Sequence, residues 1–129
     1  MVNLYINERR VGNVTVLDLK GRVRIGGTTV ALHRTIRSLI QEGKLLILLN
    51  LADVSHVDSC GLGELIASHI SLRNKGGEIR LLGLTEDLRE LMSVSKLLAI
   101  FNVYESESEA VDSFGSDVLA EKKPRLAFV

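Results

Sequence analysis

The stretch that decides the fold is Lys44-Leu45-Leu46-Ile47-Leu48-Leu49-Asn50-Leu51, which is followed by Asp58-Ser59-Cys60-Gly61-Leu62-Gly63. The first string is apolar on both faces, which is typical of a central strand covered by helices. The second string contains small residues that favour a tight turn, and it leads into a helical pattern. We expect residues 53–63 to form a loop, followed by a helix that ends at Gly76-Gly77. The apolar face of this helix consists of Leu62, Leu65, Ile66, His69 and Ile70.

Two strands and a helix are predicted before this stretch. Residues 4–6 and 14–19 alternate like strands, and Gly12-Asn13 between them suits a hairpin turn because both residues tolerate positive φ. A helix then follows Gly26, and Gly43 fits as its C-terminal cap. The apolar stripe of this helix consists of Leu32, Ile36, Leu39 and Ile40.

Further elements are predicted after this stretch. Residues 78–82 read as a strand, and Thr85-Glu86-Asp87 begins a helix with acidic residues in its first turn, where the helix dipole favours them. A short strand at 100–104 follows, and Ser106 and Glu109 have capping-box spacing ahead of a last helix. The stripe of the first of these two helices consists of Leu88, Leu91, Met92 and Leu98.

The predicted order is therefore β-β-α-β-α-β-α-β-α, which indicates an α/β fold. Alternation of strands and helices favours a mixed, largely parallel sheet layered with helices. Residues 1–114 are expected to form a single domain, and residues 115–129 a flexible basic tail.

Composition excludes several classes of protein. The 129 residues suit one globular domain, and the formal net charge of zero with 4% aromatic residues argues against a dedicated nucleic-acid binder. A single cysteine cannot form an internal disulfide, and the start of the chain lacks the pattern of a signal peptide. The aliphatic run Leu45–Leu49 is far too short to span a bilayer. We expect a cytoplasmic protein without membrane insertion.

The segment 58–63 is the strongest candidate for a functional site. The first N–H groups of a helix lack internal partners, so the helix N-terminus attracts hydrogen-bond acceptors and anions. From local physics alone, Asp58 or Ser59 is simply the helix N-cap, and the glycines permit the turn. A phosphate on Ser59 would add roughly two negative charges beside this N-terminus, which any docked partner would have to desolvate.

These motifs resemble the STAS domain family, which includes anti-sigma factor antagonists and the C-terminal domains of sulphate transporters. The resemblance covers about residues 3–114. It rests on Leu17-Asp18-Leu19-Lys20-Gly21, on Leu49-Asn50-Leu51 ahead of 57–63, on Lys75-Gly76-Gly77, and on residues 81–84 with the Leu-rich helix that follows.

The resemblance implies a partner-switching role without catalysis. Antagonists of this family bind an anti-sigma factor that is also a serine kinase, and thereby release the sigma factor. The kinase phosphorylates the serine after the motif aspartate, here Ser59, which breaks the complex, and a separate phosphatase resets the switch. The docking surface that the family implies here consists of Asp58, Ser59, Cys60, Gly61, Leu62 and Gly63.

Two positions depart from the family pattern. Cys60 stands where a second Ser or Thr is common, and a small residue there keeps the geometry. Arg24 stands near a position that is commonly acidic in the family, so the charge is reversed beside the docking face. We include Arg24 among the partner-binding residues, where the reversed charge could select a different partner.

Other interpretations stay open. The chain could be a phosphorylation-independent STAS subunit of a larger signalling or lipid-transport assembly, with Ser59 only as a cap. A redox sensor built on Cys60, or an enzyme built on the histidines, is a further alternative. His69 is expected to be partly buried on its helix, whereas His33 and His56 are expected at the surface. The sequence has no Walker loop, dinucleotide-binding glycine pattern or nucleophile elbow, so no enzyme activity, metal or cofactor is predicted.

Overall fold

The computed structural model describes residues 4–23 and 27–115. The elements run in the order β1 (Leu4–Val11), β2 (Val14–Val23), α1 (Gly27–Gln41), β3 (Leu46–Val57), α2 (Ser59–Asn74), β4 (Glu78–Leu82), α3 (Glu86–Val94), the 3-10 helix η1 (Leu97–Ala99) and β5 (Val103–Tyr104). Helical residues 107–115 follow β5.

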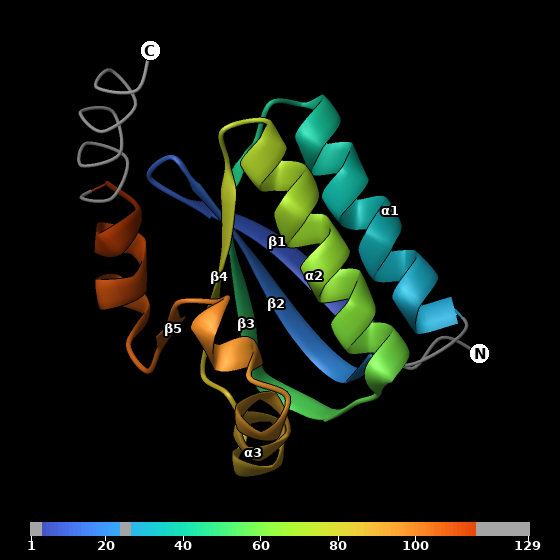
Figure 1. The fold of residues 1–129 in the computed structure, drawn as a ribbon. Helices are drawn as coiled ribbons and strands as arrows, with labels where there is room; N and C mark the ends of the chain where they lie inside the picture. The colour runs from blue at the N-terminus through green and yellow to red at the C-terminus, as the bar shows by residue number, and fades with distance from the viewer. Residues whose placement is uncertain (1–3, 24–26, 116–129) are drawn as a thin grey trace.

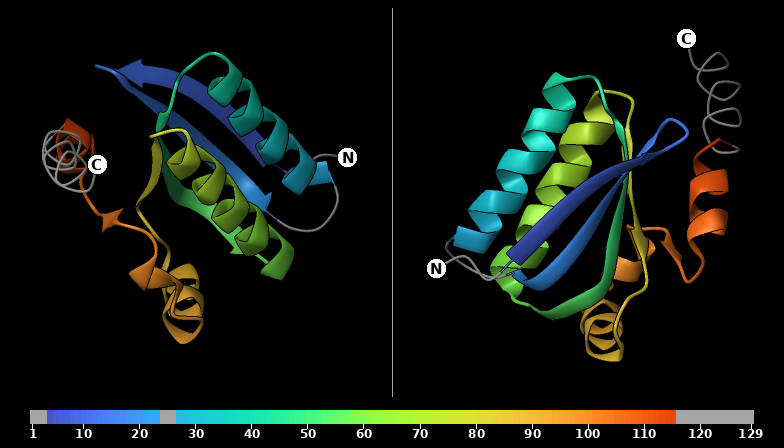
Figure 2. Two further views of the ribbon diagram at one scale, coloured as in Figure 1. Left: turned by 45° about the horizontal axis from the view of Figure 1, so that its top comes forward. Right: turned by 180° about the vertical axis from the view of Figure 1, so that it is seen from behind.

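The five strands form one mixed sheet in the order β1-β2-β3-β4-β5. β1 and β2 are an antiparallel hairpin, and the three remaining strand pairs are parallel. α1 and α2 lie side by side on one face of the sheet, and helical residues 107–115 lie on the opposite side (Figures 1 and 2). α3 lies at the end of the sheet where β3 ends (Figure 1). The predicted fold class, a mixed sheet layered with helices, is confirmed.

Both faces of the sheet are buried, as the apolar strings predict. β2 sends Leu17 and Leu19 into the larger core, beneath α1 and α2, and Val16 into the smaller core on the other face. β3 behaves in the same way, because Leu49 belongs to the larger core and Leu48 to the smaller one. This two-sided burial fixes β3 in the middle of the sheet.

A buried cation joins the last helix to the second face of the sheet. Arg80 on β4 is only 1% exposed, and its guanidinium bonds Glu78 at 2.5 Å, the Tyr104 hydroxyl at 3.0 Å and the Ser113 hydroxyl at 2.7 Å. The same guanidinium lies 4.9 Å from the centre of the Phe114 ring. A buried charge is stable only when it is paired and hydrogen-bonded, and Arg80 meets both conditions.

A second ion-pair network reaches the same helix from the hairpin. Arg9 on β1 donates to Asp18 on β2 at 2.6 Å and to Glu107 at 3.0 Å. The Arg9 guanidinium lowers the pKa of Asp18 to about 2, chiefly by this hydrogen bond. Asp18 also accepts from the amide of Asn50 on β3 at 2.9 Å, so the network connects three strands and a helix.

The predicted loop at 53–63 is wrong, because β3 continues to Val57 and α2 begins at Ser59. The pairing of β2 with β3 shifts register between Asp18 and Lys20 and again between Gly21 and Arg22. These irregularities break the period-2 alternation along β3, so its second half does not read as a strand.

Three further predictions need correction. Ile70 and Leu91, which were assigned to apolar faces, are 53% and 37% exposed. Leu98 lies in η1 rather than on α3, and the strand expected from residue 100 is reduced to Val103–Tyr104. Lys96 adopts a left-handed φ of 62° just before η1, which turns the chain earlier than the sequence indicates. The predicted tail, residues 115–129, begins at Gly115, which is still helical, and residues 116–129 lie outside the described residues.

Several local predictions are confirmed. Gly12 and Gly43 have φ of +62° and +78°, as the hairpin turn and the helix end require. The Thr85 side chain caps α3 by accepting from the N–H of Leu88. The Ser106 hydroxyl accepts from the N–H of Glu109 at 3.5 Å, which is one half of the predicted capping box.

Candidate functional site

The candidate site is the turn where β3 passes into α2. Asp58 is the N-cap of α2, and its Oδ1 accepts from the N–H of Gly61 at 2.8 Å. The carbonyl of Asp58 accepts the first helical bond, from Leu62 N–H at 2.9 Å. Of the two residues that could cap the helix, Asp58 therefore does so, and Ser59 becomes the first residue of the helix.

The turn is fastened to the neighbouring strand. The N–H of Asp58 donates at 3.1 Å to the carbonyl of Val23, the last residue of β2, which pairs with Val57. A Cβ at Gly61 would lie 2.4 Å from the same carbonyl oxygen and 3.0 Å from Cγ1 of both Val23 and Val57. Only glycine fits at this position, so Gly61 sets how closely α2 approaches the sheet.

The two residues between the cap and this glycine face solvent. Ser59 and Cys60 are both exposed, and Cys60 is a free thiol. Ser59 stands at the positive end of the helix dipole, next to the Asp58 carboxylate. The site thus presents an accessible hydroxyl on a turn that is held by its neighbours rather than by the hydroxyl itself.

The remaining predicted site residues have different environments. Leu62 is buried and belongs to the larger core, so it anchors the helix. Gly63 is exposed, and a Cβ there would meet no atom within 4 Å, so packing does not require a glycine. Arg24 lies outside the described residues, and its position beside the turn stays a prediction.

A shallow cleft next to this turn was not predicted from the sequence. It has a volume of about 220 Å³ and lies between the end of β3 and α3. Val57 lines the cleft and also packs beside Gly61. Leu91 on α3 lines the cleft and is 37% exposed, and Val94, three residues further along α3, is 78% exposed. The sequence carries no local signal of this cleft, because its lining comes from β3 and α3, which are far apart in the chain.

The three histidines lie in different environments. His69 is 7% exposed, more buried than predicted, and its Nδ1 accepts from the N–H of Ile79 at 3.3 Å. Burial lowers the pKa of the His69 imidazole. His33 and His56 lie at the surface, as predicted. Among residues 4–23 and 27–115, no group of three or more His, Cys, Asp or Glu side chains could hold a metal ion.

Comparison with protein-family models matches residues 5–110 to the STAS domain. The chain belongs to the STAS domain family. The anti-sigma-B factor antagonist of Listeria monocytogenes is 33% identical over 70 residues, which cover 54% of this chain and 60% of that protein. This chain thus matches under two thirds of that relative. The anti-sigma-B factor antagonist of Staphylococcus aureus is 28% identical over 96 residues, 70% of this chain and 89% of that protein.

Solved structures share the fold. The anti-sigma factor antagonist SpoIIAA in its unphosphorylated form superimposes with a TM-score of 0.72 and 22% identity, over 84% of this chain and 95% of that one. The phosphorylated form of SpoIIAA from Bacillus gives a TM-score of 0.68 at 22% identity, over 84% of this chain and 98% of that one. In the described part of the chain, no helix is both long and apolar enough to cross a membrane.

Proposed function

We propose that this STAS domain is an anti-sigma factor antagonist. It binds an anti-sigma factor that is also a serine kinase, and this binding frees the sigma factor for transcription. The names of the Listeria and Staphylococcus relatives support this role. The domain acts by binding in the cytoplasm, without catalysis, cofactor, direct nucleic-acid contact or membrane insertion.

Ser59 is the phosphoacceptor in this proposal. The observation that carries the proposal is the division of roles at the turn, where Asp58 caps α2 and Ser59 is exposed as the first helical residue. A kinase can therefore reach the hydroxyl, and its modification leaves the Asp58–Gly61 hydrogen bond in place. SpoIIAA, which shares this fold, has been solved in phosphorylated and unphosphorylated forms.

Phosphorylation would act on the surface rather than on the fold. A phosphate adds roughly two negative charges, which the helix N-terminus stabilises internally. The Asp58 carboxylate next to it repels those charges, and a docked partner would have to strip water from them. The complex with the kinase therefore breaks, while α2 and the sheet stay as they are. A phosphatase that removes the phosphate restores binding.

The docking surface has two kinds of residue. Ser59, Cys60 and Gly63 are exposed and would meet the partner directly. Gly61 and Leu62 are buried and keep the turn in the presented geometry, as does the cap at Asp58. Arg24 would contribute a positive charge near the turn. The cleft beside α3, with exposed Leu91 and Val94, extends this surface with apolar contacts.

The test is affinity capture from a lysate of the source organism with four baits. These are the unmodified chain, Ser59→Ala, Ser59→Asp, and a charge control, Ser108→Asp, at an exposed position in the last helix. An ATPase-type kinase held by every bait except Ser59→Asp supports the proposal. Retention of the same proteins by all four baits contradicts it, and indicates instead a phosphorylation-independent subunit of a larger signalling or lipid-transport assembly.

A further inference from the structure

The helix α3 carries apolar side chains that the fold leaves uncovered. Its inner face packs Leu88 and Met92 into the larger core, whereas Leu91 and Val94 are 37% and 78% exposed. Ile100, shortly after this helix, is 46% exposed. The other large apolar side chains exposed in the described part of the chain are spread one each over β1, α1 and α2. Single exposed apolar residues are ordinary, but several on one short segment mark an interaction site.

Acidic side chains stand next to these apolar ones. Positions spaced i, i+3, i+4 and i+7 share one face of a helix. On α3 the residues at this spacing are all exposed, and we call them the α3 face: Asp87, Glu90, Leu91 and Val94. A shallow hollow of about 540 Å³ is lined by Asp87, Glu90 and Val94 together with residues 86, 89 and 93. The acidic and apolar groups therefore form one surface.

The carboxylates of the α3 face lack cations of their own. Neither Asp87 nor Glu90 forms an ion pair with any residue that the structure describes. Arg89, the one basic residue of α3, donates instead to Glu105 at 2.5 Å. The helix dipole favours an acid in the first turn, which accounts for Asp87, but Glu90 lies beyond that turn. The α3 face is therefore acidic and available to a cationic partner.

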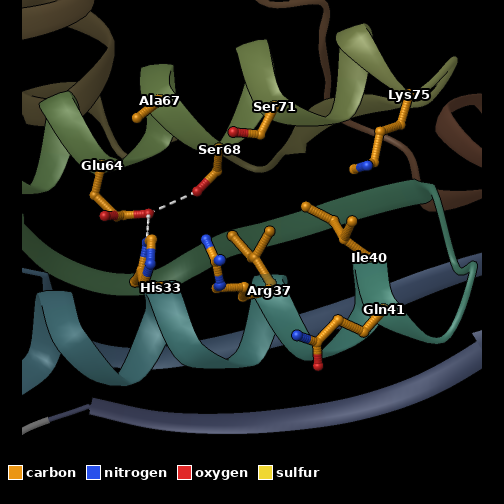
Figure 3. Close-up of a pocket in the computed structure, with 10 residues that line it drawn as sticks. His33, Arg37, Ile40, Gln41, Glu64, Ala67, Ser68, Ser71 and Lys75 are labelled. Carbon is orange, nitrogen blue, oxygen red and sulfur yellow. Dashed lines mark hydrogen bonds and ion pairs between the residues drawn. The ribbon is translucent and has the colours of Figure 1, made fainter.

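The groove between α1 and α2 does not offer a comparable surface. Its carboxylate, Glu64, accepts from the Ser68 hydroxyl at 2.7 Å and lies 3.0 Å from Nδ1 of His33 (Figure 3). Its cations, Arg37 and Lys75, lie at opposite ends of the groove (Figure 3). The charged groups of this groove are thus either partnered or far apart, so they do not select one kind of charged ligand.

We infer that the α3 face docks a protein segment in which apolar residues are flanked by lysine or arginine. The apolar side chains of the segment cover Leu91 and Val94, and its cations lie against Asp87 and Glu90. The carboxylates would repel the phosphates of a nucleic acid or of an anionic membrane. A basic segment of a protein is therefore the partner that fits this surface.

The partner that supplies this segment is the anti-sigma factor of the proposed function, on which the inference rests. Leu91 lines the cleft beside β3 together with Val57. Val57 also packs beside Gly61 in the turn that presents Ser59. The α3 face and the turn are therefore close enough for one partner to cover both.

The first test is an NMR titration of the ¹⁵N-labelled chain with two synthetic peptides that share one pattern of leucines. One peptide carries lysine at every polar position and the other carries glutamate. We expect saturable shifts at amides of residues 86–100 with the lysine peptide and none with the glutamate peptide. Equal shifts with both peptides, or no saturable shift at these amides, would overturn the proposal. Broadening of the same amides with protein concentration alone would also overturn it, because a second copy would then occupy the face.

The second test measures the affinity of three variants for the lysine peptide and for the kinase captured by the unmodified chain. Glu90→Lys reverses an exposed charge and should weaken both interactions at least about threefold. Val94→Ser removes exposed apolar area and should also weaken both. Asp112→Lys, the same change from acid to lysine at an exposed position of the last helix, should bind within twofold of the unmodified chain.

The two tests separate a failure of this inference from a failure of the proposed function. If Glu90→Lys holds the kinase as tightly as the unmodified chain while Ser59→Asp loses it, the proposed function stands and this inference is wrong. If no kinase is captured, the proposed function fails, and the peptide titration alone decides whether the α3 face selects a basic segment.

Discussion

Gly61→Ala isolates the contact that fixes α2 against β2. The new Cβ would lie 2.4 Å from the carbonyl oxygen of Val23, a distance that real Cβ atoms essentially never show. The obstacle is backbone, so a side-chain rotation cannot relieve it, and α2 or the end of β2 must shift. Overpacking of this kind costs roughly 1–3 kcal/mol. The same carbonyl also accepts from Asp58 N–H, so the shift would disturb the cap as well.

Gly63→Ala is the matched control on the same helix. A Cβ there meets nothing within 4 Å, and alanine in a helix is favoured over glycine by roughly 0.5–1 kcal/mol. Urea unfolding followed by circular dichroism should therefore give changes of opposite sign, a loss for Gly61→Ala and a gain for Gly63→Ala. If both variants gain stability, the close approach of α2 to Val23 does not exist, and the description of the turn is wrong.

Four further predictions concern the networks and the docking surface. Arg80→Met removes a buried partner of a carboxylate and should lower the free energy of unfolding by roughly 3–5 kcal/mol in a denaturant titration. The pKa of Asp18 is about 2 in the folded chain, against 3.8 for an aspartate without partners. The stability that its pair with Arg9 contributes is therefore present above pH 3.8 and is lost as the pH falls toward 2. Asp18→Asn should flatten the profile of stability against pH in this range. Burial lowers the pKa of His69 below 6.5, so on acidification the unfolded chain takes up a proton before the folded chain does, and stability falls as the pH drops below 6.5. His69→Gln should lessen that fall, and an unchanged slope of stability against pH would contradict the lowered pKa of His69. Val94→Asp, at a position 78% exposed, should leave the unfolding midpoint almost unchanged yet weaken capture of the partner, and a large loss of stability would show that Val94 is not free.

The sequence was most informative where local chemistry and tertiary burial agree. The alternation at 14–19, the two-sided apolar string of β3 and the caps at Gly43 and Thr85 each follow from rules of period or turn geometry, and the structure confirms them. The motif 58–63 also indicated a helix N-terminus correctly. Only the structure shows which residue caps the helix and which is its exposed first residue, because Asp58 and Ser59 are equally good caps by residue type.

The predictions failed where contacts between residues distant in the sequence determine the structure. The second half of β3 pairs with β2 across two register irregularities, so Leu51, Val54 and Val57 are buried without alternating strictly. Ile70 and Leu91 fit apolar stripes, yet 53% of Ile70 and 37% of Leu91 stay exposed, because the packing of neighbouring elements decides which side chains are covered. The cleft between β3 and α3 brings together residues far apart in the chain, and no local pattern encodes such a cleft.

The most direct test of the central claim compares the affinities of the unmodified chain and the chain phosphorylated at Ser59 for the captured kinase. Both forms are measured by calorimetry, and their circular dichroism spectra are recorded alongside. The account predicts that phosphate on Ser59 weakens binding by at least about a hundredfold, while the circular dichroism spectrum does not change. Because each tenfold change in affinity corresponds to about 1.4 kcal/mol, this is a loss of roughly 2.8 kcal/mol of binding free energy. Affinities within twofold of each other, or a phosphorylated chain that loses its helical signal, would contradict it.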